Sequence, residues 1–540
     1  MIGRRDWLVA ALLCVSITIL TSAFSTRQGI TRDEAYYMKA GELYVRYYED
    51  ALTGRLKDPF ADQAIASYWS YNTEHPPLLK TMYGVSWRVF HRGLGVVSEI
   101  TAFRLPTVMS FGLLCALIYL FFVEALGSRW GAMAAALLTF LQPRAFFHAQ
   151  TASFDLPIAS LWVATTIAYW RALGAKSWRP AIVTGLLFGL CLATKLQSFL
   201  LPLALTLHAA WLLMRGKRDT AFSALKSLLM MSLVGPAVMF ALWPWLWHDT
   251  FGRLGSYLRF HLEHVHYNFE YLGRNFNQPP FPWHEPLGML LFTAPVILLV
   301  LAAVGIVLLA SRSAPVAGDD RSTRALMLVA GVVPVAIFLW GTQPIYGETK
   351  HWLATMPFLA LAAGYAFDRL LVGLVEELRL AGDRSRSLLV AAPLLVIVVV
   401  PAAVEAWHGH PYQLSHYNAL AGGPPGGADL GMNRQFWGYS VKGLLPWLNA
   451  NLPHGAKLYP HDMNHDSWLR YVRDGQLRSD LVETGGVAGS DAAVVIHEKH
   501  FNEFDYQAWE AFGHVQPAEV LTLDGVPLVS VYLSRSTDRR

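Results

Sequence analysis

Long apolar stretches with few charges recur along the chain, and they restrict its fold more than any other feature. A helix that crosses a bilayer needs about 20 largely apolar residues, and about eleven stretches approach that length. The sequence therefore predicts a polytopic α-helical membrane protein with about eleven transmembrane helices. They are expected at roughly 7–26, 104–123, 129–143, 156–171, 180–194, 196–214, 222–247, 286–311, 325–341, 352–370 and 387–405.

The composition excludes several classes of protein. Of the 540 residues, 54% are hydrophobic and only 15% are charged, whereas soluble domains carry about 25% charged residues. The formal net charge of +4 is too small over this length for a nucleic-acid-binding surface, so no nucleic acid is expected as a partner. The cysteines Cys14, Cys115 and Cys191 all lie in apolar stretches, which excludes a disulfide framework and a cysteine-based zinc site.

Charges in the short loops predict the orientation. The first apolar stretch is longer than the 7–15 residues of a signal-peptide core, so we interpret it as a retained anchor. Lysine and arginine gather in alternate loops, which are cytoplasmic by the positive-inside rule. We therefore expect a multi-pass membrane protein with a cytoplasmic N-terminus and an extracytoplasmic C-terminus. The cytoplasmic set includes Arg4, Arg5, Arg171, Lys176, Arg179, Arg215, Lys217 and Arg218.

Three polar segments remain, and all are predicted on the outer side. Two are loops at about 27–103 and 248–285, and the third is the tail from about 406. The tail has apolar, strand-like runs at 456–459, 492–496 and 528–533, with helical patterns near 467–473 and 504–512. We expect a transmembrane domain at 1–405, with the chemistry in its two outer loops, and a small extracytoplasmic α/β domain at 406–540.

The first outer loop carries two adjacent acids, Asp33 and Glu34, just beyond the first span. A carboxylate that is partly desolvated at the membrane surface can act as a general base. The alternative is that these acids cap the helix that follows. Further along, Glu74 and His75 precede Pro76-Pro77, whose rings fix the backbone before the next helix.

Other polar residues mark the outer ends of the predicted spans. Asp155 begins the fourth span, where a lone acid would cost about 2.5–3.5 kcal/mol to insert, so it should face a wet cavity or a partner; the alternative is an N-cap. Arg144, Lys195, Lys350 and His351 lie at the same boundary, and snorkelling anchors would give the same pattern. Together these residues predict a site for an anion with a lipid tail.

The order of a first span, an Asp-Glu loop, a Glu-His-Pro segment and a second-loop Asp resembles the C-type membrane glycosyltransferases. The most similar groups are the protein O-mannosyltransferases and the lipid A aminoarabinose transferases. The resemblance covers roughly residues 1–370 and implies transfer of a hexosyl or pentosyl group from a polyprenyl-phosphate donor to an extracytoplasmic acceptor, which is a protein, a lipid or a glycan. Membrane lipids are the other expected partners, and the resemblance implies a location in the bacterial inner membrane.

By position, the resemblance implies that Asp33 is the catalytic acid, with Glu34 as its neighbour, and that Asp155 orients the acceptor or the base. It implies contacts to the donor phosphate from the segment that here reads Glu74-His75-Pro76, where the family has lysine in place of His75. Lys80, one turn on, can supply the missing charge. The remaining candidates for the phosphate are Arg144, Lys195, Lys350 and His351.

The resemblance also implies a divalent metal held by Glu74 and His264, while an amphipathic helix on the membrane surface is the alternative reading of the His264 segment. No other cofactor is expected. Asp33 would take a proton from the acceptor hydroxyl, with inversion at the sugar carbon. A transporter or flippase of a lipid-linked anion is the alternative function, and it predicts an inverted repeat that we do not find in the sequence. No chemistry is assigned to the segment Phe436-Trp437-Gly438.

Overall fold

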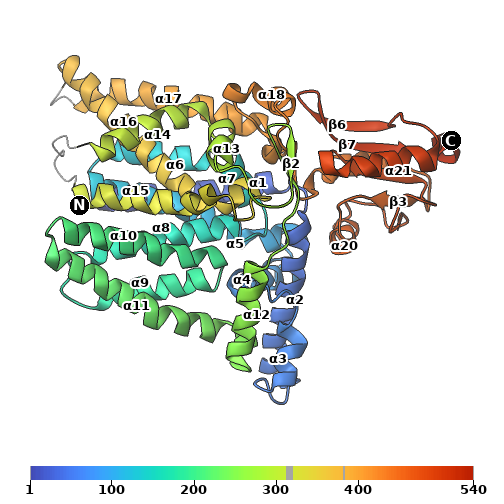
Figure 1. The fold of residues 1–540 in the computed structure, drawn as a ribbon, viewed down its shortest axis with the longest axis horizontal. Helices are drawn as coiled ribbons and strands as arrows, with labels where there is room; N and C mark the ends of the chain where they lie inside the picture. Colours follow the sequence, from blue (N-terminus) through green and yellow to red (C-terminus); the bar gives the residue numbers. More distant parts are fainter. Residues whose placement is uncertain (1, 312–319, 381–383, 539–540) are drawn as a thin grey trace.

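The computed structural model describes residues 2–311, 320–380 and 384–538. Most of them form a bundle of long helices, and a smaller body of strands and helices stands at one end of it (Figure 1). Each predicted apolar stretch coincides with helix in this bundle. The helices are α1 (Arg4–Ser25), α5 (Glu99–Leu126), α6 (Arg129–Phe140), α8 (Asp155–Ala172), α9 (Arg179–Leu192), α10 (Leu200–Met214), α11 (Arg218–Leu242), α13 (Glu285–Thr293), α14 (Val296–Ala310), α15 (Arg321–Ala336), α16 (Met356–Glu377) and α17 (Arg384–His408).

Seven helical segments of the described chain are long and apolar enough to cross a membrane. Two further apolar helices, α9 and α14, are shorter. The chain is thus a multi-pass membrane protein, and the count of eleven spans stays a prediction. The stretch expected at 286–311 is two helices, because Ala294 is extended (ψ 149°) and Pro295 cannot continue the hydrogen bonding of α13.

Small residues bring the helices of the bundle close together. A Cβ atom at Gly305 of α14 would collide with the backbone of Ala362 on α16, and one at Gly112 of α5 would collide with Cys14 of α1. Van der Waals contact between closely spaced backbones is a main source of helix association in membranes. The largest apolar cluster between the helices includes Phe111, Trp162 and Leu361, and a second cluster includes Leu298 and Phe367.

Shorter elements gather at one end of the bundle, which we call the sheet end (Figure 1). The end that carries the N-terminus is called the opposite end. The hairpin strands β1 and β2 are antiparallel. The elements before the C-terminal part are α2 (Arg32–Leu52), α3 (Asp62–Trp69), α4 (Leu78–Ser86), α7 (Pro143–Ala149), α12 (Thr250–Leu262), β1 (Phe269–Tyr271) and β2 (Arg274–Phe276).

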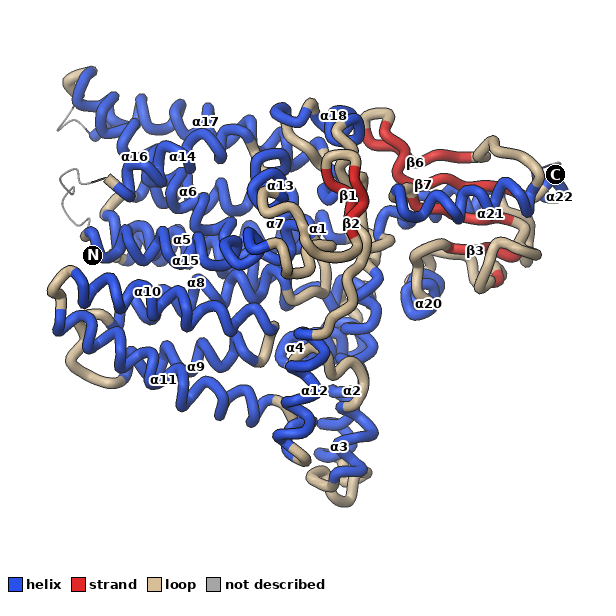
Figure 2. The backbone as a smooth tube through the Cα atoms, in the orientation of Figure 1, coloured by secondary structure: helices blue, strands red, loops and turns tan. Residues whose placement is uncertain are grey.

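The C-terminal residues contain a five-stranded sheet of order β4-β3-β5-β7-β6 (Figure 2). Strand β3 is parallel to β4 and β5, whereas β7 is antiparallel to β5 and β6. Three of the strands coincide with the apolar runs noted in the sequence, and the boundary at 405 stays a prediction. The elements are α18 (Gly423–Asp429), α19 (Leu445–Asn451), β3 (Lys457–Pro460), α20 (His465–Arg473), β4 (Val482–Glu483), β5 (Ala492–Ile496), α21 (Asn502–Phe512), β6 (Glu519–Leu523), β7 (Val526–Leu533) and α22 (Arg535–Asp538).

The C-terminal sheet packs on the sheet end through a shared core. Ile30 and Tyr83 from the first half of the chain lie in the same apolar cluster as Leu444 and Leu528. At its edge the buried Arg470 forms ion pairs with Glu42 on α2 and with Glu99 on α5. The C-terminal part is therefore fixed against the segments that hold the predicted catalytic residues.

Candidate active site

Asp33 lies in the first turn of α2, at the sheet end. Its Oδ2 atom accepts a hydrogen bond of 2.8 Å from the indole Nε1 of Trp437 and lies 4.0 Å from Nζ of Lys350. One third of the Asp33 side chain (33%) is exposed. Asp33 is thus a carboxylate that the protein orients on one side and leaves accessible on the other.

Asp155, the first residue of α8, is buried and has two partners. Its Oδ1 atom lies 2.5 Å from Nζ of Lys195, and its Oδ2 atom lies 3.5 Å from Nδ1 of His148. The His148 ring packs edge-on against Trp437, with the ring centroids 5.7 Å apart. Trp437 and His148 therefore connect the two acids. We use the name acid site for the group Asp33, Asp155, Lys195, Lys350, His148 and Trp437.

Lys350 occupies a 3₁₀ turn, Glu348–His351, beside both acids. Its Nζ atom lies 4.3 Å from the centroid of the Trp437 ring and 5.1 Å from that of Tyr346. Burial lowers the pKa of Lys350, while the charges of Asp33 and Asp155 oppose that shift. The acid site thus pairs two carboxylates with two lysines, so the formal charges of these four side chains cancel.

The C-terminal segment holds Trp437 over the start of α2. The backbone N–H of Arg32 donates to the Trp437 carbonyl (2.9 Å), and the Arg32 guanidinium lies 2.7 Å from Asp462. Trp437 has a positive φ of 80°, which is rare for a bulky residue. Such strain concentrates at functional sites. No chemistry was predicted for Phe436-Trp437-Gly438, and Trp437 and His148 are the two residues of the acid site that sequence reasoning missed.

The contacts of Glu34 are those of a structural residue, and its role as a catalytic residue stays a prediction. Both of its oxygens contact the Arg104 guanidinium, at 2.7 and 2.9 Å, and the two side chains are 0% and 1% exposed. Glu34 also accepts hydrogen bonds from the backbone N–H groups of Thr31 and Ala152. The capping alternative therefore holds for Glu34, whereas Asp33 points its carboxylate at Trp437 instead.

Lys80 is also a structural residue. Its side chain is fully buried, and Nζ donates to the backbone carbonyls of Asn72 and His75 and to the Asn72 side chain. Burial lowers the pKa of Lys80 to about 7. Because Nζ donates its hydrogen bonds to the loop 72–75, we leave Lys80 out of the proposed phosphate-binding set.

Arg144 has a buried protein partner as well. Its guanidinium forms an ion pair with Glu348, and both side chains are 1% exposed. The guanidinium carbon also lies 5.6 Å from the ring centroid of Tyr417. The structure thus places the charge of Arg144 against a carboxylate in the interior, so we leave it out of the proposed phosphate-binding set.

Burial disfavours the charged form of the two predicted phosphate-binding histidines. Burial lowers the pKa of His75 and of His351 well below the ordinary range, and neighbouring lysines add to both shifts. His351 Nε2 accepts a hydrogen bond from the Gly347 N–H (3.2 Å), and the His75 ring packs against Tyr37. We therefore leave both imidazoles out of the cations assigned to the phosphate, although a neutral ring can still donate one hydrogen bond.

The two candidate metal ligands have separate partners. Glu74 accepts a hydrogen bond from the Asn72 side chain, and its backbone carbonyl lies 2.8 Å from His261 Nε2. The His264 ring stacks on Tyr346, with centroids 5.6 Å apart. Across the described residues, no group of three or more His, Cys, Asp or Glu side chains is arranged to hold a metal ion. The metal held by Glu74 and His264 stays a prediction, and we assign it no step.

Comparisons with known proteins agree with the resemblance seen in the sequence. Residues 74–247 match the family described as dolichyl-phosphate-mannose-protein mannosyltransferase. This segment contains Asp155, Lys195 and His148 of the acid site, whereas Asp33, Lys350 and Trp437 lie outside it. No curated protein matches the chain.

Among solved structures, the oligosaccharyltransferase of Archaeoglobus fulgidus in its apo form matches with a TM-score of 0.50 and 11% identity. The match covers 95% of this chain and 71% of that one, and it indicates a shared fold. The ArnT protein of Cupriavidus metallidurans bound to undecaprenyl phosphate matches with a TM-score of 0.48 and 16% identity, over 99% of both chains. The resemblance to the C-type membrane glycosyltransferases is confirmed.

Proposed function

We propose that the chain is a membrane glycosyltransferase that moves a sugar from a polyprenyl-phosphate donor to an extracytoplasmic acceptor, with inversion at the anomeric carbon. The family match over residues 74–247 supports the reaction class and a lipid-phosphate donor. The observation that carries the proposal is the Asp33 carboxylate, which is one-third exposed and oriented by Trp437 beside Lys350. A base needs this combination of fixed geometry and access to its substrate.

In the proposed reaction Asp33 accepts the proton of an acceptor hydroxyl. The hydroxyl oxygen then forms a bond to the anomeric carbon on the face opposite the lipid phosphate, which gives inversion. The bond between the anomeric carbon and the phosphate oxygen breaks, and its electron pair leaves with the polyprenyl phosphate. The sugar arrives already activated on the lipid, so the enzyme must orient the two substrates and stabilise the charge that develops on the phosphate.

Lys195 and Lys350 are the cations that we assign to the donor phosphate. Lys195 is 14% exposed and Lys350 is 10% exposed, and both face the carboxylates of the acid site. Asp155 is almost fully buried between Lys195 and His148. Asp155 is therefore a positioning residue that holds Lys195 in place, and Asp33 is the proposed base.

The charge pattern of the loops supports an orientation with the sheet end outside the cytoplasm, in the bacterial inner membrane. The acid site then faces the compartment that contains the acceptor. A polyprenyl chain could lie along the apolar helices while its phosphate reaches the two lysines. The nature of the sugar and of the acceptor is left open among hexoses or pentoses, and among proteins, lipids or glycans.

The decisive experiment compares Asp33→Asn with wild type in purified, lipid-reconstituted protein supplied with a panel of polyprenyl-phosphate sugars. Loss of a general base costs about 10²–10⁴-fold in turnover. We expect Asp33→Asn to fold normally and to release polyprenyl phosphate at least about a hundredfold more slowly. Asp62→Asn is the matched control, because Asp62 is an acid of α3 that pairs with Arg253 on the surface. Wild-type turnover by Asp33→Asn would remove Asp33 from the mechanism.

A further inference from the structure

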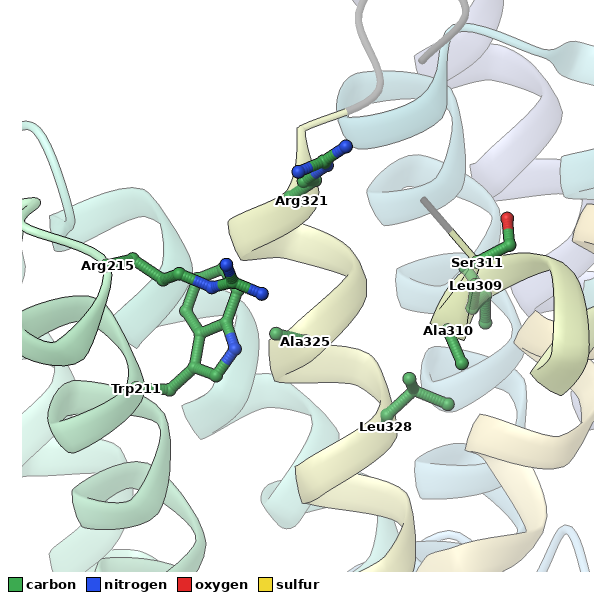
Figure 3. A pocket seen from close by; sticks show the side chains of 8 residues that line it. All are labelled: Trp211, Arg215, Leu309, Ala310, Ser311, Arg321, Ala325 and Leu328. Carbon is green, nitrogen blue, oxygen red and sulfur yellow. The ribbon is translucent and has the colours of Figure 1, made fainter. Parts of the chain in front are cut away.

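A hollow is lined by side chains at the ends of three helices (Figure 3). These helix ends stand at the opposite end of the bundle, away from the sheet end (Figure 1). The hollow has a volume of about 140 Å³ and sits between the ends of α10 and α14 and the start of α15. About 10–15 Å³ of such space holds one water, so the hollow can admit a group of several atoms. Its walls include Trp211, Arg215, Leu309, Ser311, Arg321 and Leu328.

The lining combines positive charge with apolar surface. Arg215 and Arg321 come from different helices, and Figure 3 shows them at the ends of these helices, while Leu328 lies further along α15. The Arg215 guanidinium lies 5.5 Å from the ring centroid of Trp211. None of the described residues that line the hollow is acidic. An anion with an attached apolar chain matches both parts of this wall.

The position of the hollow identifies the source of such an anion. Helices α10 and α15 belong to apolar segments long enough to span a membrane, so their ends lie at the bilayer boundary. Tryptophan and arginine are typical of that boundary, and basic pockets between transmembrane helices bind anionic lipid head groups. The neighbouring acid Asp320 pairs with Lys217 at 3.0 Å, so its charge is offset at this end.

We propose that this hollow binds the head group of an anionic phospholipid. The lipid phosphate would lie between Arg215 and Arg321, which both offer guanidinium groups suited to phosphate oxygens. One acyl chain would follow the apolar wall at Leu309 and Leu328 into the bilayer. The bound lipid then joins α10 to α14 and α15 at the membrane surface, and it stabilises the folded protein in proportion to its occupancy.

The test measures lipid binding to the full chain in detergent by native mass spectrometry and by thermal unfolding. Phosphatidylglycerol is the anionic probe, and phosphatidylcholine is the zwitterionic comparison. We expect Arg215→Gln/Arg321→Gln to bind phosphatidylglycerol about thirtyfold more weakly than wild type, which is equivalent to about 2 kcal/mol. Two arginines at an anionic membrane surface contribute about that much. Lys176→Gln/Arg179→Gln removes the same charge from another predicted cytoplasmic loop and should bind like wild type.

A second variant tests the space in the hollow without changing its charge. Ala325→Leu fills the space between the arginines and the apolar wall while it keeps both positive charges, and it should also weaken phosphatidylglycerol binding. If the double arginine variant does not fold, Ala325→Leu alone tests whether the hollow binds phosphatidylglycerol. Undiminished binding by either variant, equal binding of phosphatidylcholine, or an equally strong arginine-dependent binding of inorganic phosphate would each overturn the proposal.

Discussion

The contact between Glu34 and Arg104 gives a prediction that separates a structural acid from a catalytic one. Glu34→Gln removes the negative charge but keeps the shape of the side chain. It leaves Arg104 buried, with 1% of its side chain exposed, and places an amide N–H₂ group where two oxygens now accept four hydrogen bonds. Breaking a buried ion pair by removing one partner costs about 3–5 kcal/mol. We therefore expect Glu34→Gln to lower the free energy of unfolding by about that amount.

The assay is denaturant unfolding in detergent, combined with turnover measured per folded molecule. Turnover by the folded fraction should stay within about threefold of wild type, because Glu34 does not reach the acid site. Arg104→Gln/Glu34→Gln should cost less than the sum of the two single changes, since no unpaired charge remains. A Glu34→Gln protein as stable as wild type with a hundredfold loss of turnover would refute the structural role and restore Glu34 as a catalytic residue.

Two further predictions concern the hydrogen bonds from Lys80 to the loop 72–75 and the orientation of the chain in the membrane. Lys80 has a pKa of about 7 in the folded protein against an ordinary value of 10.5, so the unfolded state binds more protons between these values. The stability of wild type relative to Lys80→Met should therefore rise as the pH increases from about 7 to about 10, measured by unfolding at a series of pH values; a flat difference would contradict this. Impermeant thiol reagents added outside intact cells should label a cysteine placed at Asn451 and should not label one at Lys217, and the reverse pattern would invert the proposed orientation.

The membrane-spanning part of the fold was predictable because it depends on a local property. A long apolar stretch has few alternatives to a helix within a bilayer, and each predicted stretch does coincide with helix. The exception at 286–311 also has a local cause, since Pro295 interrupts the hydrogen bonding between α13 and α14. Composition alone did not reveal this break, because the residues on both sides of it are apolar.

The partners of the charged residues were not predictable in the same way. Glu34 and Arg104 are 70 residues apart in sequence, and Asp33 and Trp437 are 404 residues apart. Sequence position placed Asp33 and Glu34 side by side at one boundary, and it could not tell which of the two faces the interior. The distinction arises from the helical turn, which directs Glu34 toward Arg104 and Asp33 toward the C-terminal segment.

Burial explains why few of the predicted cations remain available for a phosphate. A charge taken out of water is costly unless a protein group compensates it, so a buried lysine or arginine acquires a partner when the chain folds. Lys80 donates to backbone carbonyls, and Arg144 forms an ion pair with Glu348. Lys195 and Lys350 instead face carboxylates at the partly exposed acid site. A donor phosphate there would not meet an unpaired charge but would compete with Asp155 and Asp33 for the same lysines, so donor binding itself would loosen Lys350 from Asp33.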